Sequence, residues 1–290
     1  MSLLFTAVSP HLLVATSRTY VTNVGILHDG PHAALIDPGL HPDEVEDITA
    51  ALDERSLHAD SIVLTHHHWD HVLGASRFPE ACVVAQVRFT ELLQARFEHA
   101  LRSIGRFDTE AGREPRSFVA PVPAVTVDRI LPLMVGGMRV LLVHTPGHAG
   151  DHLSIYDAES ACLWAGDILS DLEIPFVNDR LDAYERTLAM MAGMDIRILV
   201  PGHGHTTSDT DAIQRIIRED RSYLSGLRTR VEAVVLAGGS AQAAVVACAD
   251  MTFRNPGQNA ESHVMNVEQA FLECGGSAPP CPSLGWSREP

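Results

Sequence analysis

Short apolar runs separated by turn residues fill the first 36 positions of the chain. They are rich in β-prone residues, so we predict antiparallel strands for this region. The apolar period then changes from two to about 3.6, since Val45, Ile48 and Leu52 share one face of a helix expected over residues 41–56. The acidic residues of that segment come early, where they suit the positive end of a helix dipole.

Strand-like and helix-like segments alternate through the middle of the chain. Apolar runs predict strands within SIVLT, ACVVAQV, MRVLLVH, HLSIYD, CLWAGD and IRILVP. Between them we expect an amphipathic helix over 87–104 that ends at Gly105, a loop at about 106–120, and a further helix over 180–193. Each half offers strands and then a helix, so the pattern favours an α+β protein.

After residue 208 the sequence pattern predicts helices only. Expected helices cover about 209–237, 240–250 and 261–274. We therefore predict a main domain over 1–207, a helical appendage over 208–274, and a disordered tail over 275–290, where proline is frequent and periodicity is weak.

Composition and charge argue against several classes of protein. The hydrophobic fraction of 46% is that of an ordinary globular protein, and the net charge of −16 argues against a phosphate backbone as partner. No apolar run reaches the roughly 18 residues of a membrane span, and the N-terminus reads poorly as a signal peptide. Five cysteines form no CxxC pair, so we expect neither a disulfide framework nor a cysteine zinc site, and a cytoplasmic location.

A dense group of metal-binding residue types follows the strand-like run SIVLT. His66 and His68 share one face of an extended chain, whereas Asp70 and His71 are adjacent and diverge. All four can converge only if the chain bends, so we expect a loop that leads from the strand into a helix, with Asp70 near its positive end.

Three further residues of the same types lie downstream, each close behind an apolar run and a glycine. They are His148 in TPGH, Asp167 in AGD and His203 in PGH. Glycine lets the backbone turn sharply at such strand ends. Because one loop cannot complete two coordination shells, these residues are the expected partners of the first group.

The set HxHxDH, TPGH, GD and PGHG, in this order, resembles the metallo-β-lactamase superfamily, and THHHWDH with HTPGHAGDH is most similar to its glyoxalase II branch. The resemblance covers residues 20 to 205 or so. It implies a four-layer αββα sandwich, with residues 1–207 as the catalytic domain, and a pair of metal ions at one sheet edge.

The resemblance also implies a role for each residue. His66, His68 and His148 would bind one metal, Asp70, His71 and His203 the second, and Asp167 would bridge them. Asp37 matches an early aspartate that supports the ligands through a hydrogen bond. Imidazole and carboxylate ligands suit zinc, with iron or manganese as alternatives.

Two metal ions can share a water and lower its pKa toward about 7. We therefore expect a metal-dependent hydrolase in which a bridging hydroxide, oriented by Asp70, cleaves a thioester, ester or lactone of a small-molecule acyl substrate. The segment after Asp167 lacks the basic residue with which glyoxalase II helps to hold glutathione, so glutathione recognition stays open.

Alternatives to the dinuclear hydrolase remain. A persulfide dioxygenase would use one iron on His66, His148 and Asp167, and a module that binds metal without turnover is a third reading. The helix at 87–104 is expected to be a solvated face over a core face, with a lid or a homodimer contact as the alternative.

Other polar residues have structural readings. We expect packing or hydrogen-bonding roles for His67 and Trp69, structural roles for His144 and His152, and a surface or supporting role for His205. Pocket-lining residues are expected from 87–125, from the segment after Asp167, and from the C-terminal helices.

Overall fold

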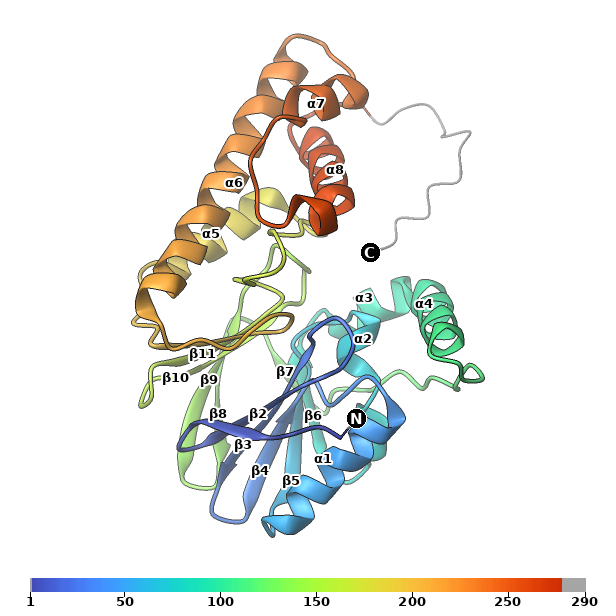
Figure 1. Ribbon diagram of the computed structural model, residues 1–290, viewed down its shortest axis with the longest axis vertical. Helices are drawn as coiled ribbons and strands as arrows, with labels where there is room; N and C mark the ends of the chain where they lie inside the picture. The colour runs from blue at the N-terminus through green and yellow to red at the C-terminus, as the bar shows by residue number, and fades with distance from the viewer. Residues whose placement is uncertain (1, 278–290) are drawn as a thin grey trace.

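Two β-sheets form the centre of the molecule in the computed structural model, which describes residues 2–277 (Figure 1). The predicted tail therefore lies mostly outside the described residues. The first sheet holds seven strands in chain order: β1 (Thr6–Ser9), β2 (Leu12–Thr16), β3 (Asn23–Asp29), β4 (His32–Ile36), β5 (His58–Val63), β6 (Cys82–Gln86) and β7 (Val125–Val127). The second has the order β12 (Ile198–Pro201), β11 (Cys162–Gly166), β10 (Leu153–Asp157), β9 (Met138–His144) and β8 (Ile130–Val135).

Both sheets change from antiparallel to parallel pairing. Strands β1 to β4 pair antiparallel, as their sequence predicts, while β4 to β7 pair parallel. In the second sheet only β11 and β12 are parallel. Helical connections make the parallel pairs possible, because parallel strands need a crossover.

Side-chain alternation divides each strand between two hydrophobic clusters. In β4, Ala34 and Ile36 face the space between the sheets, and Leu35 faces the helices on the outer side. In β11, Trp164 faces the other sheet and Leu163 faces outward. The sheets therefore enclose one core and carry a second on each outer face.

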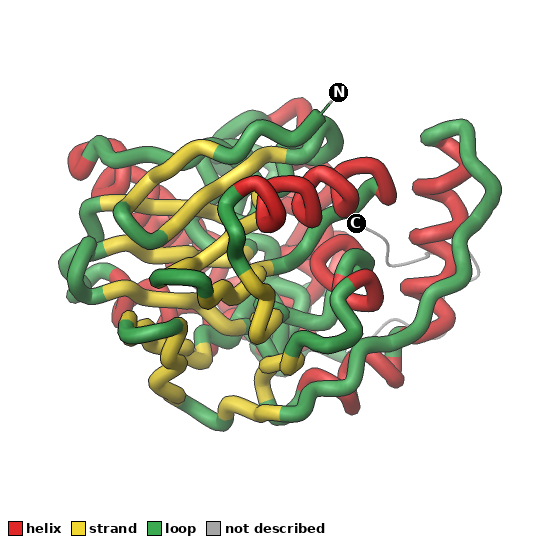
Figure 2. The backbone as a smooth tube through the Cα atoms, turned by 90° about the horizontal axis from the view of Figure 1, so that it is seen from below, coloured by secondary structure: helices red, strands yellow, loops and turns green. Residues whose placement is uncertain are grey.

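Helices cover both outer faces. Residues of α1 (Pro42–Glu54), α2 (Trp69–Val72) and α3 (Phe89–Ala95) pack on the first sheet beside the short 3₁₀ helix at Ala75–Arg77. Helix α5 (Leu181–Met191) and the three C-terminal helices pack on the second. Figure 2 shows helices outside the strands in a view turned by 90°. The predicted four-layer αββα sandwich with additional C-terminal helices is confirmed.

The C-terminal helices are α6 (Thr210–Leu236), α7 (Ala241–Cys248) and α8 (Pro256–Glu273). The Asp209 side chain caps α6 by accepting from two backbone N–H groups. Helix α8 begins five residues before the predicted start, because Pro256 supplies a first helical residue whose φ is already set. A single hydrophobic cluster joins these helices to β11 and α5, and the boundary at 207 stays a prediction.

The prediction for residues 87–120 was wrong in two details. The helix breaks near Arg96 into α3 and α4 (Phe97–Glu110), and α4 continues through Gly105 into the segment expected to be a loop. Contacts outside the helix hold this extra turn, since the buried carboxylate of Asp108 accepts from Arg113 and Arg116 and Phe107 packs with Leu40 and Leu73. Strands β7 and β8 were not predicted.

Candidate metal centre

The histidine cluster lies where β5 ends and α2 begins. Helix α2 has His68 as its N-terminal flanking residue and Asp70 in its first turn. The chain thus bends out of the strand at the cluster, as predicted. Asp70 stands near the positive end of this short helix, where backbone N–H groups favour a carboxylate.

The three downstream residues lie on turns at strand ends of the second sheet. His148 follows β9, Asp167 follows β11 directly, and His203 follows β12. Gly166, before Asp167, has a φ of 59°, and a side chain there would meet His152 Nε2 at 2.4 Å. Glycine is therefore required at this turn for both conformation and space.

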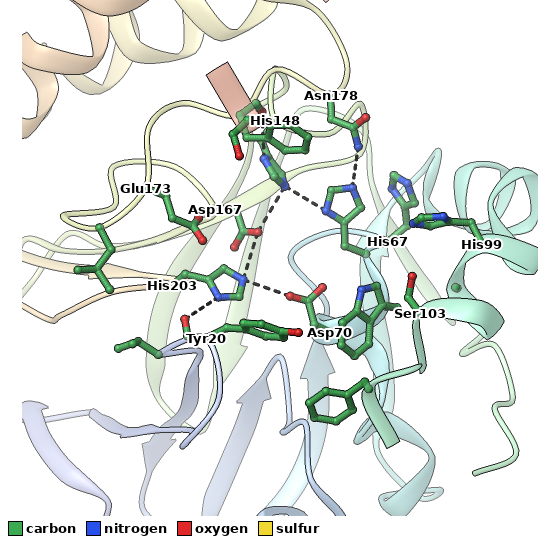
Figure 3. A pocket seen from close by; sticks show the side chains of 18 of the residues that line it. Tyr20, His67, Asp70, His99, Ser103, His148, Asp167, Glu173, Asn178 and His203 are labelled. Carbon is green, nitrogen blue, oxygen red and sulfur yellow. Dashed lines mark hydrogen bonds and ion pairs between the residues drawn. The ribbon is translucent and has the colours of Figure 1, made fainter. Parts of the chain in front are cut away.

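All seven predicted ligands converge in two groups. The first holds His66, His68, His148 and Asp167, the second holds Asp70, His71 and His203, and within each group one atom per residue lies within 4.8 Å of the others. Asp167 stands between the groups, and Figure 3 shows it beside His148 and His203: its Oδ2 is 3.3 Å from His148 Nε2 and 3.5 Å from His203 Nε2. Its Oδ1 is 3.3 Å from His71 Nε2.

The two groups fit divalent cations. Among the described residues, His66 Nε2 and Asp167 Oδ1 are buried and have no hydrogen-bond partner. Buried polar atoms are almost always satisfied, so an atom that faces other ligands without a partner is suited to an ion. Only nitrogen and oxygen donors are present, which suits zinc, iron or manganese.

The sequence match decides the family. Residues 18–203 match the profile of the metallo-β-lactamase superfamily, and this segment contains all seven predicted ligands. The chain belongs to this superfamily.

Relatives within the superfamily are named as hydrolases, at modest identity. Hydroxyacylglutathione hydrolase of Acidiphilium cryptum is 29% identical over 80% of this chain and 82% of its own length. An atrochrysone carboxyl ACP thioesterase of Aspergillus chevalieri is 25% identical over 71% of this chain and 60% of its own. The lactamase-like protein aptB of Emericella nidulans is 27% identical over 66% and 54%. The chain therefore spans only 54 to 64% of several of these curated relatives.

Solved structures confirm the superfamily fold. A metallo-β-lactamase family protein of Thermus thermophilus aligns with a TM-score of 0.65 at 23% identity, over 92% of this chain and 93% of its own. A sec-alkylsulfatase of Pseudomonas sp. aligns with a TM-score of 0.72 at 16% identity, over 96% and 52%. In the part of the chain that the structure describes, no helix has both the length and the apolar character of a membrane span.

Each histidine of the centre contacts a supporting residue through the ring nitrogen that points away from the other candidate ligands. His71 Nδ1 lies 2.9 Å from Asp37 Oδ2, as the superfamily resemblance predicts, and Asp37 also accepts from the Thr65 hydroxyl and backbone N–H. The contacts of the other four histidines join His66 to Thr65 Oγ1, His68 to the Asn178 amide, His148 to Phe176 O, and His203 to both Thr22 Oγ1 and Tyr20 O. Such contacts fix ring orientation and raise ligand basicity.

Burial and charge set the protonation of the centre. Burial lowers the pKa of His66 and His68 well below the usual range of imidazole, so both rings are neutral, the form that binds metal. Burial also opposes charge on His71 and His203, but nearby carboxylates, Asp167 first, outweigh it and raise both pKa values. The pKa of Asp167 is correspondingly lowered by the histidines around it, against the effect of burial.

A cavity of about 410 Å³ opens beside the two groups. Its lining includes residues of α4, residues 172–178 after Asp167 and residues of α8, which are the predicted sources of pocket-lining residues. Sequence reasoning missed Tyr20 and Val21, which also line it and have φ values of 57° and 52°. A positive φ strains the backbone of a non-glycine residue, and such strained residues are frequent at functional sites. No local sequence signal marked them.

Several residues have the structural roles that were expected. His67 Nδ1 lies 2.7 Å from Asp151 Oδ1, and His152 Nε2 accepts from the backbone N–H of Asp167. His205 is exposed and contacts Asp171, while Trp69 packs on Phe107 with ring centroids 5.2 Å apart. All four described cysteines are free thiols.

Proposed function

We propose that this chain is a dinuclear metal-dependent hydrolase that cleaves a thioester, ester or lactone. The observation that carries the proposal is the position of Asp167 between two groups of ligand atoms, with its carboxylate 3.3 Å from a histidine nitrogen of each group. A pair of bound cations, zinc being expected, would supply a shared hydroxide near neutral pH and polarise the carbonyl under attack.

Asp70 orients the attacking water in this proposal. Its Oδ2 lies 3.2 Å from His203 Nε2, and the residue also lines the cavity, so its second oxygen can accept a hydrogen bond from the water and orient it. Burial opposes ionisation of Asp70, but His71 and His203 outweigh it and lower the pKa of the carboxyl. The group is therefore an acceptor at neutral pH.

Apolar side chains provide the place for an acyl group. Tyr20, Trp69 and Phe107 contact one another through their rings and line one side of the cavity. Phe176 and Ile174 line it from the segment after Asp167. These surfaces can exclude water from a carbonyl group. The thioesterase and hydroxyacylglutathione hydrolase among the relatives support thioesters as the first substrates to test.

The mononuclear iron alternative uses residues of the first group only. His66, His148 and Asp167 are together in that group, but the second group of Asp70, His71 and His203 is equally complete. The complete second group favours the hydrolase. We further propose a small-molecule substrate, in line with the net charge of −16, and a cytoplasmic location, with a homodimer left open.

Elemental analysis of protein purified without added metal tests the proposal. About two equivalents of zinc, or of zinc and iron together, with turnover of simple thioesters, esters or lactones, is the expected result. Asp70→Ala should abolish turnover and deplete the second metal, whereas His205→Ala, at an exposed histidine, should change neither. One equivalent of iron with oxygen uptake on a persulfide would overturn the hydrolase.

A further inference from the structure

We propose that the face of α4 that lines the cavity binds an anionic group of the substrate, away from the scissile carbonyl. This inference deepens the proposed function, because it assumes that the metal centre holds the reacting end. The face consists of His99, Ser103 and Arg106 of α4 and of Arg96, which flanks the helix at its N-terminus; all four residues line the cavity. Their spacing of three and four residues brings them to one side of the helix.

Ser103 is the strongest indication that this face binds a ligand. Its side chain lines the cavity, the residue is 3% exposed, and its Oγ has no hydrogen-bond partner among the described residues. A helical hydroxyl usually bonds the carbonyl one turn back, as Thr109 does on the same helix with Gly105 O at 2.8 Å. Ser103 does not, and a buried hydroxyl without a partner costs free energy that a ligand can restore.

Figure 3 shows Ser103 and His99 on the opposite side of the cavity from Glu173. A substrate that spans the cavity from the metal centre can therefore meet α4 with its far end. The carboxylate of Glu173 would repel an anion from its own wall and so favour the same orientation.

The charge of this face is opposite to that of the chain. Arg96 and Arg106 stand there against one acid, Glu110, although the chain carries 37 acidic and 21 basic residues. Arg96 also donates to Asn178 Oδ1 at 3.1 Å. A guanidinium has five N–H donors, so a protein partner leaves donors that can reach a ligand. Guanidinium and hydroxyl groups together are typical of a site for carboxylate or phosphate.

The anion can belong to either part of the substrate. A carboxylate at the far end of the acyl chain and a phosphate on the leaving group offer the same oxygen acceptors to α4. The two sources differ in which fragment binds to the protein by itself, and a binding experiment can separate them.

Isothermal titration calorimetry of the metal-loaded protein with two pairs of non-reacting ligands tests the proposal. One pair is the monoethylamide of glutaric acid against N-ethylpentanamide, and the other is 4′-phosphopantetheine against pantetheine. In at least one pair the anionic member should bind about tenfold more tightly than its neutral partner. The pair that shows the difference identifies the source of the anion.

Matched variants assign the effect to the face. Arg106→Ala and Ser103→Ala should reduce the preference for the anionic member and leave binding of the neutral member unchanged. Arg102→Ala is the control, since Arg102 is exposed on the same helix and does not line the cavity. Equal binding within both pairs, or an equal loss in Arg102→Ala, would overturn the proposal.

Binding of these ligands does not require turnover, so the two proposals fail separately. A protein that prefers the anions but hydrolyses nothing would contradict only the proposed function. A protein that hydrolyses a neutral thioester and shows no preference for anions would contradict only the α4 site.

Discussion

The two walls of the cavity differ in how the chain positions them. The metal wall is built from residues at strand ends, such as His66 after β5 and Asp167 after β11. The wall over residues 170–180 has no helix or strand of its own. Side chains from the C-terminal part of the chain hold it instead. The sheets therefore position the candidate metal ligands. Residues 170–180, which we call the substrate wall, depend instead on contacts with residues far away in the sequence.

Helix α8 and the residue pair before it make most of these contacts. Asn266 accepts from Val177 N at 2.7 Å and donates to Pro175 O at 2.6 Å, and Gln269 donates to Asp179 O at 2.9 Å. The remaining contacts run from Arg254 to Ser170 O and Glu173 O, from Asn255 and Asn259 to Leu172 O, and from Leu181 N to Glu273. Helix α8 and the two residues before it thus support one wall of the candidate site.

The comparison predicts the largest loss of activity for the residue between the two metal groups. Asp167→Asn keeps the shape of the side chain but removes its charge, so we expect kcat to fall roughly a thousandfold, since a metal site supplies several kcal/mol of stabilisation. Metal content should fall in the same preparation. Normal metal content with full activity would contradict the central position of Asp167.

A smaller loss of activity is expected from a change at Asp37, which contacts a candidate ligand but is not itself one. Asp37→Asn weakens the contact to His71, and changes at such supporting groups typically cost about 10- to 100-fold in metal affinity or activity. Titration with a zinc-sensitive dye would measure the affinity. Asp60→Asn, at a surface aspartate between His32 and His58, is a matched control and should leave zinc affinity unchanged.

The substrate wall should respond differently. Asn266→Ala leaves the buried backbone groups of Pro175 and Val177 without partners, each worth about 1–3 kcal/mol, so the free energy of unfolding should fall. We expect KM to rise about tenfold with metal content unchanged. Denaturant unfolding, KM and elemental analysis test this. Glu268→Ala, at an exposed position of α8, is the control. Loss of metal in Asn266→Ala would mean that the walls are not separate.

The same difference explains what the sequence could predict. His148, Asp167 and His203 were predictable because each follows a strand-like run and a glycine within a few residues. Asn178 was not, since its contact with His68 joins residues 110 positions apart and no motif surrounds it. Ser103 was not predictable either, because nothing in the sequence distinguishes it from other helix residues. Its position depends on how α4 packs against the cavity. The extra turn of α4 was missed for the same reason, as Arg113 and Arg116 hold it from outside the helix.

The smallest effect on activity is expected from a buried pair behind the substrate wall. Burial raises the pKa of Asp220 from 3.8 to about 7, outweighing the attraction of Arg254, whose guanidinium lies 2.6 Å away. Between these pH values the unfolded chain has lost the proton that the folded chain keeps. The unfolded state therefore binds fewer protons, and this group's contribution to stability falls as pH rises from about 4 to about 7.

Asp220→Asn should remove that slope. The difference in unfolding free energy between wild type and variant, measured by denaturant at several pH values, should change across this window and become constant below it. Arg254 also donates to Glu173 O, so KM should change only about twofold, in the direction of weaker binding. A pH-independent difference would show that Arg254 keeps Asp220 ionised throughout, and the substrate wall would then be supported by a permanent ion pair.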